Sequence, residues 1–352
     1  MKRRSVALVF LSVCLACGDD SPSSLAQGGS AGDGGADGGG PQLDAGPSAP
    51  TALWVPSNDP GAPDMLDLTV HSQAMGRDVL VRLILPASYA TQPSRHYPVL
   101  YLLHGANDSL SYRAWSEQTN VETLALGRDL IVAMPEGGQC GWYSDWAGQC
   151  NPAGAAPPGI DNQPSWETFH TSELPAVLRQ YYRANTQSSI AGLSMGGLGA
   201  TSYAARHPGM YSAAASYSGA LHSSNNDFVL KITLTQAGCA NTDAVWGPVA
   251  QQPDVWAAHD PYLLASKLSA LPIYVSAGTG APGPLDPASA MGTDTIEMLA
   301  AAASRDFSDR LTELGSTRLV THFYGPGTHS WPYWSRELAS SFAMLTEPLT
   351  AD

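Results

Sequence analysis

A serine held between two glycines, in the sequence G-L-S-M-G at residues 192–196, has the setting of a nucleophile. This G-x-S-x-G motif follows an apolar run, residues 189–193, and precedes a predicted helix, residues 197–207. At a tight turn from a strand to a helix, glycines let the backbone pass without a Cβ clash. The serine Oγ is then exposed near the positive end of the helix. The motif and its setting predict that Ser194 attacks an ester carbonyl and accepts the acyl group.

A serine nucleophile needs a general base, and His329 is the best candidate. It lies in a Gly/Pro-rich segment, residues 325–331, after a predicted strand and before the last predicted helix. In α/β-hydrolases the triad follows the chain order serine, acid, histidine, so a late loop histidine is expected. The competing histidines have no comparable loop setting; they are His170, His207, His222, His259 and His322.

The acid of such a triad must fix the imidazole tautomer and stabilise the imidazolium ion. It is expected between Ser194 and His329 in the chain. The residues alone leave several candidates open, among them Asp286, Asp294, Glu297 and Asp306.

An oxyanion hole should use two backbone N–H groups. We expect one from Met195, directly after the nucleophile, and one from Ala106, in the loop that follows His104-Gly105. Each donor typically contributes about 3 kcal/mol of transition-state stabilisation. From residue 51 onward the sequence contains no metal-ligand spacing such as H-x-x-x-H or C-x-x-C, and no cofactor is implied.

The elements around these residues predict an α/β-hydrolase fold. Continuous apolar runs indicate strands covered on both faces, as in a parallel sheet, and two alternating segments indicate an antiparallel hairpin. Helical segments between the strands give a mostly parallel central sheet flanked by helices on both faces. The predicted strands are residues 65–72, 77–85, 99–103, 130–134, 189–193, 273–277 and 319–324, and the predicted helices are residues 166–182, 197–207, 294–314 and 333–345.

The N-terminal residues predict export. Three basic residues at positions 2–4 precede a short apolar run that ends before Cys17, as in a signal peptide, residues 1–17. The run is shorter than the roughly 20 residues that span a bilayer. Cys17 looks like a lipidated residue of a bacterial lipoprotein, although an ordinary cleaved signal is the alternative. Residues 18–50 are rich in Gly, Ser, Asp and Pro and predict a disordered linker. Residues 51–352 form the expected catalytic domain, which would be extracellular or anchored to the cell envelope.

The charge of the chain limits the kinds of partner it can bind, and its cysteines allow a disulfide. The formal net charge is -14 and only three residues are lysine, so phosphate backbones and anionic membranes repel the chain. We expect a small-molecule or polymeric ester substrate, no nucleic acid, and membrane contact only through a lipid at Cys17.

Export permits disulfides, and we predict a Cys140–Cys150 bond, which would stabilise the fold by roughly 3 kcal/mol for so short a loop. Cys239 is then left over and buried.

Eight short segments, in the same order along the chain, carry a resemblance to a known family. They are residues 137–139, 142–146, 166–169, 171–175, 192–195, 245–248, 260–261 and 327–331. With them the chain resembles the esterase-D-like α/β-hydrolases, and most closely their trehalose mycolyltransferase branch, the secreted antigen complex. The resemblance implies Ser194 as nucleophile, His329 as base and Glu297 as acid. Other esterase-D-like enzymes use an aspartate nearer the strand end, which would point to Asp286.

The same resemblance bears on substrate binding. Trp331 matches an aromatic residue that lines the acyl-acceptor site of the transferases. Those enzymes carry Asp-Gly and then an arginine where this chain has His104-Gly105 and Asn107, and a long apolar residue where it has Ala106. The sugar site is therefore expected to be remodelled, with His104 and Asn107 in contact with substrate. The leading hypothesis is an exported serine carboxylic-ester hydrolase. The alternatives are an acyltransferase to a sugar or lipid hydroxyl, and a catalytically inactive surface-binding lipoprotein.

Overall fold

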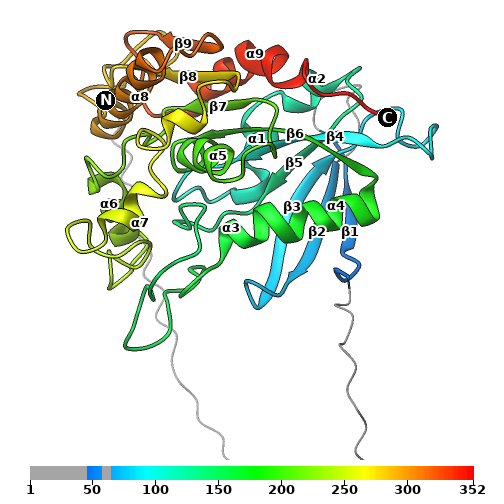
Figure 1. Ribbon diagram of the computed structural model, residues 1–352, viewed down its shortest axis with the longest axis horizontal. Helices are drawn as coiled ribbons and strands as arrows, with labels where there is room; N and C mark the ends of the chain where they lie inside the picture. Colours follow the sequence, from blue (N-terminus) through cyan, green and yellow to red (C-terminus); the bar gives the residue numbers. More distant parts are fainter. Residues whose placement is uncertain (1–45, 58–64) are drawn as a thin grey trace, which may run out of the picture. The chain divides into compact units, whose positions relative to one another are not determined.

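A computed structural model of the chain describes residues 46–57 and 65–352. Their strands form one nine-stranded sheet in the order β1-β2-β3-β5-β4-β6-β7-β8-β9 (Figure 1). The first three strands and the β3–β5 pair are antiparallel, and every later neighbouring pair is parallel. The strands are β1 (Thr51–Val55), β2 (Met65–Ser72), β3 (Arg77–Ile84), β4 (Tyr97–Leu103), β5 (Ile131–Pro135), β6 (Ala184–Leu193), β7 (Ala214–Tyr217), β8 (Ile273–Ala277) and β9 (Leu319–Phe323).

Both faces of the sheet are buried beneath helices. Along β4, Tyr97, Val99 and Tyr101 belong to one apolar cluster, whereas Leu100 and Leu102 belong to a second, because successive strand side chains point to opposite faces. The first cluster includes residues of α4 (Leu174–Tyr182), α5 (Met195–Arg206), α6 (Phe228–Gln236) and α8 (Thr295–Glu313). The second includes residues of α1 (Ala114–Gln118), α2 (Val121–Ala125) and α9 (Trp331–Thr346). The predicted mostly parallel sheet between two helical layers is confirmed.

Two details differ from the predicted elements. Strands β1 and β7 were not predicted, since β1 is exposed and β7 is only four residues long. The predicted helix 166–182 is interrupted: α3 (Trp166–Thr168) passes into a π-helical turn, Phe169–Glu173, before α4 begins. Pro175 lies in the first turn of α4 and has no N–H to continue the hydrogen-bond ladder of a preceding helix. The remaining helical segments are α7 (Pro253–Ala257) and two short 3-10 turns, Ser111–Arg113 and Ala265–Lys267.

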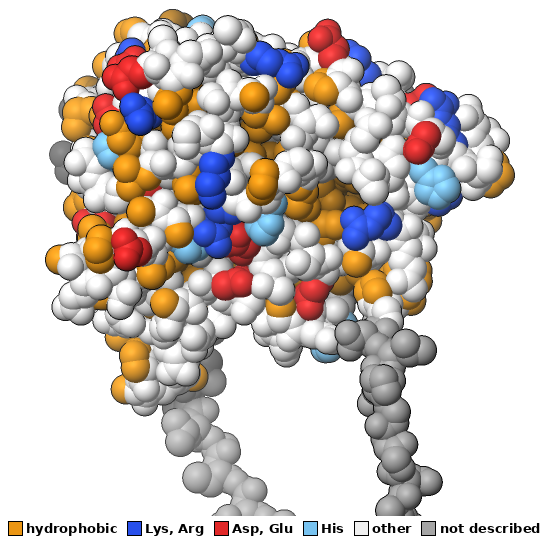
Figure 2. All heavy atoms as spheres, in the orientation of Figure 1, with side chains coloured by type: hydrophobic (Ala, Val, Ile, Leu, Met, Phe, Trp, Pro, Cys, Tyr) orange, Lys and Arg blue, Asp and Glu red, His pale blue; other side chains and the backbone are white. Residues whose placement is uncertain are grey.

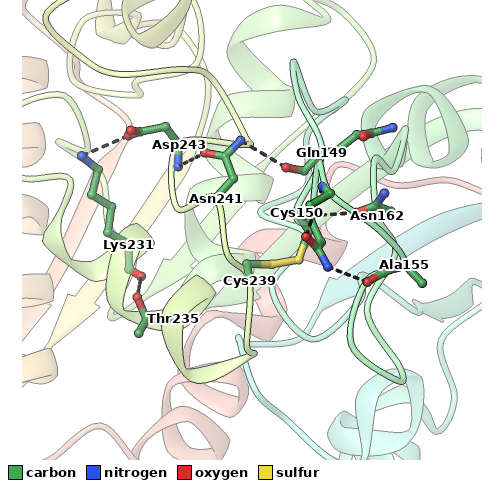
Figure 3. The surroundings of a disulfide bond; sticks show 11 residues. Gln149, Cys150, Ala155, Asn162, Lys231, Thr235, Cys239, Asn241 and Asp243 are labelled. Atoms are coloured by element: carbon green, nitrogen blue, oxygen red, sulfur yellow. Dashed lines mark hydrogen bonds and ion pairs between the residues drawn. A yellow bond between two sulfur atoms is a disulfide. The ribbon is translucent and has the colours of Figure 1, made fainter.

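The disulfide joins Cys150 to Cys239, so the predicted Cys140–Cys150 pair is wrong (Figure 3). Cys239 follows α6, and the Asn241 N–H donates to the Cys150 carbonyl at 2.9 Å, which brings the two segments side by side. Cys140 is a free, buried thiol in the apolar core. Burial raises the pKa of Cys140 to about 12, so the thiolate needed for exchange is scarce.

The surface shown in Figure 2 carries acidic and basic side chains interspersed among uncharged ones, in keeping with a chain of which 14% is charged. Within the described ranges, no helix is long and apolar enough to cross a membrane. The predicted signal, residues 1–17, and the lipidation at Cys17 lie outside the described residues, as does most of the linker at 18–50.

Candidate active site

Ser194 lies at the turn between β6 and α5. Its backbone has φ 53° and ψ -119°, a conformation that costs a non-glycine residue of order 1–3 kcal/mol and persists only where the surroundings enforce it. The enforcing contacts include a hydrogen bond from the Ser194 N–H to the Tyr217 carbonyl on β7, at 2.8 Å. A Cβ atom on Gly196 would collide with the carbonyl oxygens of Leu103 and His104 at the end of β4. The two glycines of the motif therefore allow the close approach that the strained serine requires.

His329 lies in the loop before α9 and pairs with Glu297, which lies in the first turn of α8. Its Nδ1 lies 2.7 Å from Oε2 of Glu297, whose side chain is fully buried. A buried carboxylate must have hydrogen-bond donors, and Oε1 of Glu297 accepts from the Gly278 N–H at 2.5 Å and from Ser218 Oγ at 3.0 Å. This arrangement orients the imidazole with its other nitrogen, Nε2, away from the acid. That Nε2 is buried and has no hydrogen-bond partner among the described residues.

Asp294 holds the start of α8 against the histidine loop. One carboxylate oxygen accepts from the Glu297 N–H at 3.1 Å, as a helix N-cap, and the other accepts from the His329 N–H at 2.9 Å. Both carboxylate oxygens of Asp294, one of the candidate acids, therefore accept hydrogen bonds from backbone amides. Asp306 lies far along α8, where it pairs with His222. Neither contacts the His329 imidazole through a hydrogen bond.

Asp286, the alternative acid, supports the same loop from another side. It accepts hydrogen bonds from Thr328 Oγ1, from the Gly283 N–H at 2.7 Å and from Tyr333 Oη at 2.9 Å. Desolvation opposes ionisation of this carboxyl, but these hydrogen bonds, led by that of Thr328, prevail and lower its pKa. Asp286 is therefore an anionic anchor beside His329, and the imidazole itself is paired with Glu297.

The two predicted oxyanion donors belong to α5 and to the loop after β4. Met195 is the first residue of α5, and the first N–H groups of a helix have no partner within it. Ala106 lies in the loop after β4, whose shape is fixed by a hydrogen bond from the Asn107 N–H to the Gln139 carbonyl at 2.6 Å. Ala106 and Ser194 line the same cavity. The oxyanion role of the two amides stays a prediction.

His104 supports the oxyanion loop from beneath and does not face substrate, which corrects the sequence-based prediction. Its side chain is fully buried; Nδ1 donates to the Gly105 carbonyl at 2.8 Å, and Nε2 accepts from the Gly137 N–H at 2.9 Å. The ring must be neutral to do both, and desolvation lowers the pKa of His104 accordingly. His104 occupies the position of an aspartate in the transferases, at the end of a buried strand. A side chain there can point into the cavity or into the core, and the sequence alone does not say which.

Two cavities of very different size meet at Ser194 and His329. The wide one has a volume of about 470 Å³, and Asn107, Trp331 and Ala106 line it. Asn107 donates from its side chain to Gln236 on α6 at 3.1 Å. The narrow cavity has a volume of about 20 Å³, room for about one or two water-sized groups.

Ser218 is a residue that sequence reasoning missed. It follows β7 with φ 52°, donates to Glu297 and accepts from Trp334 Nε1 at 3.1 Å. It also lines the narrow cavity. A serine directly after a strand with a glycine close behind it, here Gly219, is the signal that could have found it.

Comparison with known proteins identifies the family of this chain. The sequence model of the Esterase family matches residues 72–345. The chain belongs to the Esterase family. It is 34% identical over 277 residues to the diacylglycerol acyltransferase/mycolyltransferase Ag85B of Mycolicibacterium smegmatis, covering 77% of this chain and 81% of the relative. The Ag85B of Mycobacterium leprae is 32% identical over 81% of this chain and 84% of its own. The chain therefore lies near the mycolyltransferase branch, as the resemblance predicted.

Two solved structures have the same fold as this member of the Esterase family. MPT51 (FbpC1) of Mycobacterium tuberculosis superimposes with a TM-score of 0.64 at 26% identity, over 80% of this chain and 97% of MPT51. An S-formylglutathione hydrolase from Agrobacterium tumefaciens gives a TM-score of 0.60 at 16% identity, over 84% and 99%. The family match and the two Ag85B relatives show that the chain is an enzyme that acts on esters, by hydrolysis or acyl transfer.

Proposed function

We propose that this protein is an exported serine carboxylic-ester hydrolase that works through an acyl-enzyme. Ser194 is the nucleophile, His329 the general base and Glu297 the acid. The observation that carries the proposal is the 2.7 Å contact between buried Glu297 and His329 Nδ1, with the free Nε2 of His329 and the strained Ser194 lining the same cavities. Export is proposed on the signal-like residues 1–17 and lipid anchoring on Cys17.

In the first half-reaction, Ser194 Oγ bonds to the ester carbonyl carbon while its proton moves to His329 Nε2. The carbonyl oxygen becomes an oxyanion that the Met195 and Ala106 N–H groups stabilise. When the bond to the alcohol oxygen breaks, the proton on Nε2 passes to that oxygen and the alcohol leaves. Glu297 stays ionised and stabilises the imidazolium ion meanwhile.

In the second half-reaction, a water molecule takes the place of the alcohol. His329 Nε2 accepts one proton of the water, the hydroxide oxygen bonds to the acyl carbon, and the bond to Ser194 Oγ breaks. The proton returns from Nε2 to the serine, and a carboxylic acid is released. No group is consumed besides ester and water, so the cycle balances without a cofactor.

Acyl transfer is the second candidate, because two relatives at 32–34% identity are named acyltransferases. It shares the first half-reaction and replaces water by a sugar or lipid hydroxyl. The departures at His104, Ala106 and Asn107 favour hydrolysis. His104 is buried under the loop, so it cannot replace the aspartate that the resemblance assigns to sugar binding.

The test measures products as well as rate. Purified protein without its leader is given nitrophenyl esters with and without trehalose or diacylglycerol, beside Ser194→Ala. We expect free acid as the main product in all mixtures, and a loss of turnover in Ser194→Ala of roughly the 10⁶ scale known for serine knockouts. Formation of new ester in place of acid would establish transfer. An unchanged rate in Ser194→Ala would overturn the assignment of the nucleophile.

A further inference from the structure

The narrow cavity beside Ser194 has apolar walls from two helices and a loop. Helix α8 contributes a row of residues three or four apart, which is one face of a helix, and Val229 of α6 faces them. Polar residues of the loop between β7 and α6 complete the lining. The residues are Ala220, His222, Ser223, Asn226, Val229, Ile296, Leu299, Ala300 and Ala303, together with Ser194, Ser218 and His329.

His222 lines the narrow cavity together with the catalytic histidine, His329. Its position is held from two sides. Asp306 of α8 pairs with His222 at 2.9 Å. The imidazole of His222 also stacks on Tyr262, with ring centroids 3.9 Å apart. A ring held by a carboxylate and a stacking partner is a firm part of the cavity wall.

The chemistry decides which half of the ester each cavity holds. The alcohol must leave and water must enter while the acyl group stays bonded to Ser194. By microscopic reversibility, water attacks from the side on which the alcohol left. The wide cavity, of about 470 Å³, provides that route, and the narrow one, of about 20 Å³, suits the group that stays.

We propose that the narrow cavity is the acyl pocket and that it limits the substrate to short acyl groups, of roughly two or three carbons, on a bulky alcohol held in the wide cavity. The proposal rests on the hydrolase function above and names its substrate class. A longer chain would have to displace packed side chains such as Leu299 and Ala300, and forcing extra methylenes into a packed interior is costly.

The experiment compares nitrophenyl acetate, butyrate and octanoate on the wild type and on two matched variants. Leu299→Ala widens the narrow cavity, and Leu110→Ala makes the same change in the wide one. We expect wild-type kcat/KM to fall at least tenfold from butyrate to octanoate. Leu299→Ala should raise the octanoate-to-acetate ratio of kcat/KM at least tenfold. Leu110→Ala should change all three esters by a common factor, because it faces the alcohol.

A wild type that prefers octanoate, or a ratio that Leu299→Ala does not move, would overturn the acyl-pocket proposal while the hydrolase function stands. Absence of turnover on every ester by the wild type would overturn both. If Leu299→Ala fails to fold by circular dichroism, Ala303→Leu serves instead. It fills the pocket, so butyrate turnover should fall at least tenfold more than acetate turnover, and equal losses would contradict the pocket.

Discussion

The catalytic edge of the sheet and the wall around α6 are held in place by different means. Ser194, Ser218 and the loop of His329 follow the parallel strands β6, β7 and β9, and backbone hydrogen bonds from β6 through β9 fix their spacing. Helix α6 borders both cavities through Val229. It is held by side chains instead of strand pairing: Val229, Leu230 and Leu234 pack in the apolar core. Trp142–Thr233, Asn107–Gln236 and Lys231–Asp243 contacts and the disulfide that follows the helix complete its links.

This difference separates chemistry from specificity. The strand ends can hold the same nucleophile, base and acid whatever substrate is bound, because their positions depend on the sheet. The α6 wall can change its sequence, and thereby the size of both cavities, without moving the triad. Each prediction below disturbs one region and asks whether the other responds.

The largest effect is expected at the catalytic edge, from Glu297→Gln. An amide cannot stabilise the imidazolium ion, and the corresponding change in a serine protease lowers kcat about 10⁴-fold. Asp286→Asn is the matched control; it weakens an anchor of the loop and should lower kcat no more than tenfold. Nitrophenyl acetate kinetics on both variants measure the effects. Equal losses, or a larger loss for Asp286→Asn, would make Asp286 the acid.

Cleavage of the disulfide should act on stability and on the α6 wall. A loop of 89 residues corresponds to about 4 to 5 kcal/mol in the chain-entropy model, so Cys239→Ser should lower the free energy of unfolding by several kcal/mol in urea titrations. KM should rise while the Ser194 labelling rate by a small fluorophosphonate stays within about tenfold. Cys140→Ala, which removes the free thiol, should leave the response to reductant intact. A stability unaffected by reductant would contradict the Cys150–Cys239 bond.

A smaller effect is expected from His104→Phe, which keeps a ring but removes both hydrogen bonds of the oxyanion loop. One misplaced donor costs about 10²-fold in kcat, and we expect a loss of up to that size with little change in KM. Asn107→Ala, on the cavity side of the same loop, should instead raise KM a fewfold. The opposite pattern in steady-state kinetics would return His104 to the substrate site.

The smallest effect is expected on the pH dependence of stability, because buried histidines make the fold sensitive to acid. Burial lowers the pKa of His104, and that of His170 to about 3, whereas an unfolded histidine titrates near 6.5. Below pH 6.5 the unfolded chain binds more protons than the folded one. The free energy of unfolding therefore decreases as the pH is lowered, by about 1.4 kcal/mol per pH unit for each such group. The slope of the unfolding free energy against pH between pH 6.5 and 5 should be shallower in His104→Phe, by at most that amount. An unchanged slope would mean that His104 titrates normally.

The fold could be predicted from the sequence because its signals are local. Continuous apolar runs mark β4, β5, β6 and β8, and the G-x-S-x-G motif requires its own strand, turn and helix. The wrong or missing elements depend on long-range contacts. Cys150 bonds to Cys239 because the chain after α6 returns beside it, and spacing along the sequence carries no information about that return.

The candidate site divides in the same way. Ser194 and His329 have recognisable local settings, whereas the residues alone left the acid open. The family resemblance pointed to Glu297, with Asp286 as the alternative, and the structure pairs Glu297 with the imidazole. His104 was expected on the surface of the site and is buried beneath it. Its orientation follows from the Gly137 amide and the Gly105 carbonyl, and the first of these is contributed by a different strand end.

The most direct test of the central claim is the site of covalent modification. The leaderless protein is treated with a fluorophosphonate probe, digested and mapped by mass spectrometry, beside Ser194→Ala and Glu297→Gln. We predict one labelled peptide, modified at Ser194, no labelling in Ser194→Ala and much slower labelling in Glu297→Gln. Labelling at another residue, or unchanged labelling in Ser194→Ala, would contradict the proposed nucleophile and the triad built on it.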